Sequence, residues 1–168
     1  MLYLETLRPE RQRLVELRSR DLHTWNRSDV IEYDLAAGAP FIVSPAVTGT
    51  VLFDVRLGTP NVIERMAAPW APVTSRPINI DMHGITPWHI DVFPFRSGHA
   101  MLISGYAEDF TRQDLYIATS NDLETWTLRE TPLLTHLDPA LGVETLYRAT
   151  GVDRGPDLVV WYSMQYAP

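Results

Sequence analysis

Two carboxylates in the second half of the chain stand in settings that suit chemistry. Asp91 and Glu144 lie 53 residues apart (144 − 91), and each adjoins a short apolar run. Trp88 and His89 come just before Asp91, and Arg148 comes four residues after Glu144. Paired carboxylates can perform general acid–base chemistry, and an indole can stack on a ligand ring. The five residues form a candidate site if the fold brings these two segments together.

Each candidate also has an ordinary structural explanation. Asp91 could be a solvated strand residue, Glu144 a surface carboxylate and Trp88 a core residue. At the rise of a β-strand, Arg148 lies roughly 13 Å from Glu144, too far for a direct ion pair between them. Arg148 could therefore line the same site or form an ion pair of purely structural importance.

The histidines raise a metal site as a weaker alternative. Asp81 and His83, and likewise His89 and Asp91, are spaced to put two ligands on one strand face. This spacing lacks the further downstream ligands of a metal-binding jelly roll, and chance produces such pairs easily. We therefore expect neither a metal nor a cofactor. The histidines considered are His83, His89, His99 and His136.

Composition narrows the class of protein. The 168 residues, 45% of them hydrophobic, suffice for one ordinary domain, and the formal net charge of −7 argues against nucleic acid as a partner. There is no cysteine, which excludes disulfides and thiolate metal sites. The apolar runs are too short to span a membrane, and no signal peptide is visible, so we expect a cytoplasmic protein without a membrane partner.

The elements that must position the candidates are predicted to be strands. Thirteen prolines and nine glycines interrupt the chain at short intervals, which is typical of strands and turns. One segment, residues 10–19, could form a helix, but Pro9 and the following Ser-Asp turn favour a hairpin of residues 2–7 and 13–18. The sequence predicts an all-β fold.

A repeated heptapeptide gives the strands an order. Residues 19–25 read SRDLHTW and residues 120–126 read SNDLETW, an offset of 101 residues (120 − 19). Ser and Asp can bind downstream backbone amides in a tight turn, and the Trp can begin the next strand and pack between sheets. We expect Trp25 and Trp126 to be equivalent and buried, with Asp21 and Asp122 bonded to amides.

The offset equals two units of about 40–50 residues, the size of a propeller blade. We divide the chain, taken as a single domain, into a partial first blade at 2–34 and complete blades at 41–82 and 87–135. Residues 142–166 supply the first two strands of a fourth blade. The prediction is a partial, open β-propeller of about three four-stranded antiparallel blades. Its first and fourth sheets should expose apolar flanks, through which the chain could self-associate.

The repeated S-x-D-L-x-x-W motif resembles the five-bladed β-propeller glycosidases of families 32, 43 and their relatives. Ile90-Asp91, followed by Phe95, Gly98 and Leu102, is similar to the family 43 pattern of Ile-Asp, strand, Gly turn and strand. Glu144-Thr145-Leu146-Tyr147-Arg148, followed by residues 158–163, is similar to the strand with that family's acidic residue and the aromatic strand after it.

The resemblance implies roles for both carboxylates. Glu144 would be the general acid, and Asp91 would orient it and raise its pKa. The family's water-activating Asp belongs to a first strand that this chain lacks, since it begins at what matches a second strand. The resemblance implies an incomplete five-bladed propeller, a segment of an inverting, furanosidase-like glycosidase that acts on or binds a glycan. A non-catalytic carbohydrate-binding or assembly segment is the alternative.

Overall fold

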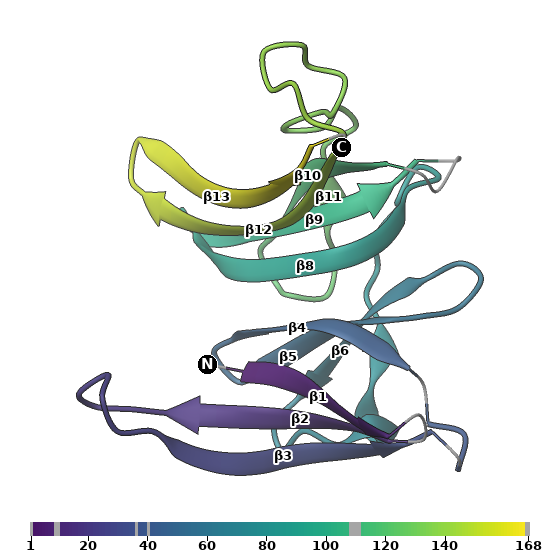
Figure 1. The fold of residues 1–168 in the computed structure, drawn as a ribbon, viewed down its shortest axis with the longest axis vertical. Helices are drawn as coiled ribbons and strands as arrows, with labels where there is room; N and C mark the ends of the chain where they lie inside the picture. Colours follow the sequence, from purple (N-terminus) through teal and green to yellow (C-terminus); the bar gives the residue numbers. More distant parts are fainter. Residues whose placement is uncertain (1, 9–10, 36, 40, 108–111, 167–168) are drawn as a thin grey trace.

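A computed structural model describes residues 2–8, 11–35, 37–39, 41–107 and 112–166. The chain forms four antiparallel sheets that follow one another along the sequence (Figure 1). The first contains β1 (Leu2–Arg8), β2 (Arg11–Arg18) and β3 (Asn26–Asp34). The second contains β4 (Ile42–Thr48), β5 (Val51–Arg56), β6 (Val62–Ala67) and β7 (Arg76–Pro77), with a 3-10 turn η1 (Pro72–Thr74) before β7.

The third sheet contains β8 (Thr86–Phe95), β9 (Gly98–Tyr106), β10 (Gln113–Ser120) and β11 (Thr127–Leu128). The fourth contains only β12 (Thr145–Arg154) and β13 (Asp157–Gln165). The expected hairpin is confirmed by the pairing of β1 with β2. No helix among the described residues is long and apolar enough to cross a membrane.

The all-β prediction, with open sheets of four antiparallel strands, is confirmed. Every sheet is built from strands consecutive in sequence, whereas a jelly roll distributes neighbouring strands between two sheets. The alternative of a metal-binding jelly roll is therefore wrong. The divisions at 2–34, 41–82, 87–135 and 142–166 contain the four sheets in order. That these sheets are propeller blades of a single domain stays a prediction.

Apolar side chains fill the spaces between successive sheets. Leu14 and Tyr33 of the first sheet pack with Leu52 of the second. Phe53 of the second sheet packs with Ile90 and Met101 of the third, and Phe93 of the third packs with Leu146 of the fourth. All of these are 7% exposed or less. Burial of these faces is the main force that stacks the sheets, at about 25 cal/mol per Å² of apolar surface.

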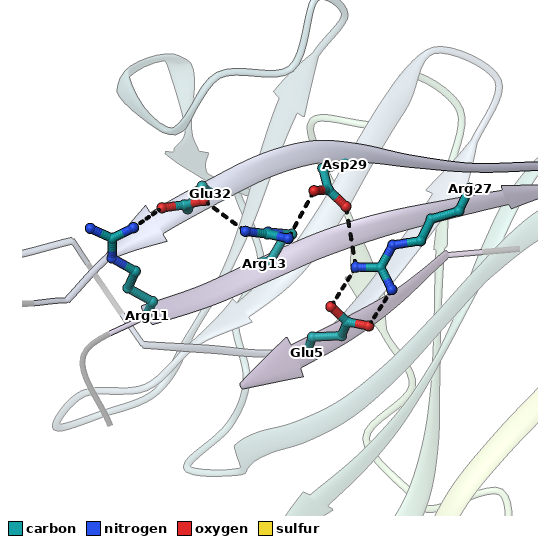
Figure 2. A network of polar contacts seen from close by, with 6 residues as sticks. All are labelled: Glu5, Arg11, Arg13, Arg27, Asp29 and Glu32. Carbon is teal, nitrogen blue, oxygen red and sulfur yellow. Dashed lines mark hydrogen bonds and ion pairs between the residues drawn. The ribbon is translucent and has the colours of Figure 1, made fainter. Parts of the chain in front are cut away.

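The outer face of the first sheet differs from the expected apolar flank. Six charged residues form a chain of ion pairs across β1, β2 and β3 (Figure 2). The Arg27 guanidinium lies 2.6 Å from Glu5, and Arg13 lies 2.8 Å from Asp29. A bulge in β3 explains the difference. Ile31 and Tyr33 alternate toward the second sheet, and the extra residue of β3 between Asp29 and Ile31 turns Asp29 to the outer face, together with Glu32. The prediction of an apolar first flank is wrong.

Both copies of the repeated heptapeptide adopt the expected turn. Asp21 Oδ1 accepts from the amides of His23 and Thr24 at 2.9 and 2.8 Å, and Asp122 Oδ1 accepts from Glu124 and Thr125 at 2.8 Å each. The two tryptophans are unlike, however. Trp126 is 3% exposed and meets Phe53 edge to face at 5.8 Å, whereas Trp25 is 45% exposed. The prediction is confirmed for Trp126 and wrong for Trp25.

Candidate functional site

A pocket of about 280 Å³ opens where the first strands of successive sheets approach one another. Strand β8 lies beside both β4 and β12, and β1 lies beside β4. Figure 1 shows these strands at the facing sides of their sheets. All four strands line the pocket. The polar side chains are Ser44, His89, Asp91, Arg148 and Thr150, and the apolar ones are Leu4, Pro45, Ile90 and Ala149.

Ser44 fixes β4 against β8. Its hydroxyl accepts from the Ile90 amide at 2.8 Å and donates to the Ile90 carbonyl at 3.1 Å. Ser44 has a positive φ of 56°. The register of β4 against β5 shifts between Val43 and Ala46, the segment that contains Ser44 and Pro45. The irregular backbone turns the Ser44 side chain toward β8 in place of regular pairing. One wall of the pocket is thus held by a serine bonded to a neighbouring backbone.

Asp91 fixes β8 against β12. Its Oδ2 accepts from the Thr150 hydroxyl at 2.7 Å and from the Gly151 amide at 3.1 Å. A Cβ at Gly151 would lie 2.6 Å from the Phe93 ring, so this close approach of the two strands requires glycine. Among the described residues, both hydrogen bonds of Asp91 go to Oδ2, which leaves Oδ1 as an acceptor beside the pocket.

His89 and Arg148 meet on the same side of the pocket. The Arg148 Nε donates to His89 Nε2 at 3.4 Å, a long hydrogen bond that assigns the imidazole proton to Nδ1. Burial, together with the positive charge of Arg148, lowers the pKa of His89 to about 4. The imidazole is therefore neutral near pH 7. Tyr147 meets it edge to face at 4.6 Å and lies under the Arg148 guanidinium at 5.8 Å.

The His89 ring also carries an unsatisfied group. Its Nδ1 is buried and has no hydrogen-bond partner in the described structure. A buried donor without an acceptor costs about 1–3 kcal/mol. Such a position in a pocket favours a role other than stability.

Glu144 lies away from Asp91. It immediately precedes β12, and its amide donates to the Gln165 carbonyl at 2.8 Å. Asp91 contacts Thr150, which is six residues farther along the chain, roughly 20 Å at about 3.3 Å per residue. The structure brings Asp91, His89 and Arg148 together and leaves Glu144 outside the group.

Trp88 is also separate from the pocket wall. Its indole is half-buried and meets Tyr106 edge to face at 5.9 Å. This contact corresponds to the structural explanation of Trp88, as a residue that packs within its own sheet. Among the described residues, no group of three or more His, Cys, Asp or Glu side chains could hold a metal ion.

The sequence reasoning missed Ser44, Thr150 and Tyr147. Thr150 and Tyr147 lie on the segment already considered around Arg148, so only their contacts were unknown. Ser44-Pro45 within a β-branched run is a signal for a bulge, and bulges redirect side chains. That signal could have marked Ser44 as a residue that faces a neighbouring sheet.

A second group of titratable residues lies in the core. Asp54 and Glu64 face each other on β5 and β6, and they are 1% and 4% exposed. Burial, with the charge of Glu64 beside it, raises the pKa of Asp54 to about 7. Arg56 forms an ion pair with Glu64 at 3.1 Å, and the Ser75 hydroxyl donates to the Glu64 carboxylate at 2.8 Å. This pair belongs to the core of the second sheet.

Comparison with known proteins gives a likeness of fold. No family model matches the sequence, and no curated protein matches it. A crystal structure of an N-acetylgalactosamine deacetylase from F. plautii, in complex with blood group B trisaccharide, is similar with a TM-score of 0.65 at 18% identity. The likeness covers 90% of this chain and 54% of that one, so the chain spans about half the length of its structural neighbour.

Proposed function

We propose that this chain binds a glycan in the pocket between its first strands. The observation that carries the proposal is the convergence of His89, Asp91 and Arg148 from β8 and β12 on one pocket. The structural neighbour was crystallised with a trisaccharide, and its likeness in fold directs the choice of ligand class.

The groups in the pocket suit sugar hydroxyls. A hydroxyl both donates and accepts, and the pocket offers the Asp91 Oδ1 as an acceptor and the outer Arg148 N–H groups as donors. The neutral His89 adds no charge beside Arg148. One carboxylate and one guanidinium balance each other, and the net charge of −7 disfavours a polyanionic ligand. A neutral, hydroxyl-rich ligand fits this arrangement.

Binding has more support here than glycoside hydrolysis. The role expected for Asp91 was to raise the pKa of Glu144 by like-charge repulsion, which acts over about 4–6 Å. Glu144 lies six residues before Thr150, roughly 20 Å at the rise of a strand, and the Asp91 carboxylate accepts from Thr150 and Gly151, which supports binding over that role. The non-catalytic alternative therefore becomes the preferred function.

The test is ligand-observed NMR and calorimetry with blood group B trisaccharide, preceded by a screen of the protein on a glycan array. Arg148→Ala should weaken the binding of the best ligand about tenfold, as expected for a lost hydrogen bond to a charged group. Arg154→Ala is the matched control, because this exposed arginine lies on the same strand outside the pocket wall. Absence of binding to any glycan, or equal losses in both variants, would contradict the proposal. Glu144→Gln should leave binding unchanged.

A further inference from the structure

Two carboxyl groups face each other inside the molecule, where the first sheet packs on the second. Asp54 of β5 and Glu64 of β6 are direct partners in the antiparallel register, and both are almost fully buried. Directly opposite residues of antiparallel strands have Cβ atoms about 4.5–5.5 Å apart. Asp54 shares a face of β5 with Leu52, which packs on the first sheet. The pocket between the first strands uses neither carboxyl.

The charges around this pair of carboxyls do not balance. Arg56 is the cation beside it, and its guanidinium forms an ion pair with Glu64 at 3.1 Å. The Ser75 hydroxyl also donates to Glu64, at 2.8 Å. The Asp54 Oδ1 is buried and has no hydrogen-bond partner in the described structure. Two carboxylates with one guanidinium would therefore leave one negative charge uncompensated in the core.

The other described elements around Asp54 bring no second cation to it. Strand β4 has no ionisable residue. The arginines of β2 make their ion pairs with exposed carboxylates, and β3 presents Tyr33 on the side that faces the second sheet. Arg65 of β6 and Arg76 of β7 both pair with Glu124, which belongs to the third sheet.

A buried carboxylate without a partner takes up a proton in preference to staying charged. Burial, with the charge of Glu64, raises the pKa of Asp54 from its ordinary value of 3.8 to about 7. The Tyr33 hydroxyl of the first sheet lies close to the same carboxyl, and burial with the charges of Asp54 and Glu64 raises the pKa of this phenol as well. The hydroxyl has no hydrogen bond of normal geometry in the described structure. A protonated Asp54 carries both a donor and an acceptor for it.

We propose that the packing of the first sheet on the second is a pH-sensitive contact, held by one proton that Asp54 and Glu64 share. When the pair loses this proton, two carboxylates face each other beside one guanidinium. Like charges directly opposite on neighbouring strands are destabilising, and burial leaves little water to screen them. The first sheet then separates from the second more often.

The direction of the pH dependence follows from proton linkage. In the opened state Asp54 is an ordinary carboxyl that ionises near pH 3.8, whereas in the packed state it ionises near pH 7. Between these values the packed state binds one more proton than the opened state, so the contact weakens as the pH rises. One proton changes the equilibrium between the two states about tenfold per pH unit. The stabilisation is complete below this range and lost above it.

The first measurement is the titration of the Asp54 carboxyl carbon, followed by NMR in the isotope-labelled wild-type protein. The midpoint should lie near neutral pH. Glu64→Gln should move this midpoint to lower pH, because it removes the like charge that faces Asp54. A wild-type midpoint below about pH 5, as for an ordinary carboxyl, would overturn the proposal. So would a midpoint that Glu64→Gln leaves unchanged.

The second measurement is amide hydrogen exchange, corrected for its intrinsic dependence on pH. The opening constant of β2 and β3 should rise about tenfold per pH unit between about pH 5 and 7 and level off above that range. Strands β9 and β10 of the third sheet should not follow this rise. Asp54→Asn has nearly the same shape and no charge, so it should abolish the rise in β2 and β3.

Asp29→Asn is the matched control, because it makes the same chemical change on the exposed, outer face of the first sheet. It should keep the pH dependence of the wild-type chain. A rise that persists in Asp54→Asn, or that disappears in Asp29→Asn, would overturn the proposal, as would an equal rise in the third sheet. The carboxyl titration uses the wild-type chain, so it decides the question even if a variant fails to fold.

Discussion

The loops at residues 19–25 and 120–126 have the same internal structure and opposite surroundings. In both, the serine hydroxyl accepts from the amide three residues on, at 2.8 and 2.9 Å, and the central leucine has a φ of 63°. The hydrogen bonds of described residues 19–25 all stay within the loop. The second loop instead joins the neighbouring sheet, since the Trp126 amide donates to the Asn79 carbonyl at 2.8 Å. Identical turn chemistry therefore does not decide whether the following tryptophan is buried.

The largest expected difference is at the tryptophans themselves. Trp126→Ala should lower the free energy of unfolding by about 3–5 kcal/mol, because a fully packed indole leaves a cavity beside Phe53. Trp25→Ala should change it by only about 0.5 kcal/mol, as at other exposed positions. Chemical denaturation of both variants measures the difference. Equal losses would mean that Trp25 is also packed in solution.

The fifth residue of the repeated heptapeptide, His23 in the first copy and Glu124 in the second, gives the next contrast. Glu124 pairs with Arg65, which is 9% exposed, and with Arg76 at 2.8 Å, whereas its counterpart His23 is exposed. Glu124→Ala should cost about 1–3 kcal/mol, because it leaves a buried guanidinium without its partner. His23→Ala should have almost no effect on the denaturation midpoint.

Arg76→Ala is the control for that pair, since this exposed arginine should contribute less than about 1 kcal/mol. If Arg76→Ala costs as much as Glu124→Ala, the buried pair with Arg65 is not the source of the stability.

The leucines at positive φ should respond in opposite directions. Leu22 is 76% exposed, so Leu22→Gly relieves backbone strain and should stabilise the chain by up to about 1 kcal/mol. Leu123 packs on the core between the second and third sheets. In Leu123→Gly the lost apolar contact should outweigh the relief and lower the melting temperature. A gain in both variants would contradict the packing of Leu123.

The smallest expected difference is at the turn carboxylates. Hydrogen bonds from Thr24 and His23 lower the pKa of Asp21, and the amides of Thr125 and Glu124 lower the pKa of Asp122. In each case the unfolded carboxyl protonates first, so the stabilisation is present above about pH 3.8 and is lost as the pH falls through the folded pKa.

Asp21→Asn and Asp122→Asn should therefore reduce the acid dependence of thermal unfolding by similar small amounts. Melting curves recorded from about pH 5 downward measure it. Unequal effects would show that the neighbouring sheet also influences the turn at Asp122.

The local pattern of the sequence determined the strands, the turns and their order. Proline and glycine spacing and β-branched runs predicted an all-β fold, and Ser-x-Asp predicted both turns, because hydrogen bonds within a few residues depend on nothing more distant. The same reasoning placed Asp91, His89 and Arg148 on strands that proved to be neighbours.

Only the tertiary structure decided which faces are covered and which side chains meet. Trp25 and Trp126 share a motif, but one has a sheet with Phe53 beside it and the other does not. The sequence pattern gave Asp91 and Glu144 similar positions at first strands. In the structure β12 packs on β8 so that Thr150 is the residue whose hydroxyl donates to Asp91. Burial and the placement of one sheet on the next are set by contacts between segments far apart in the sequence, as in the 59-residue separation of Asp91 and Thr150, and the local sequence pattern does not encode them.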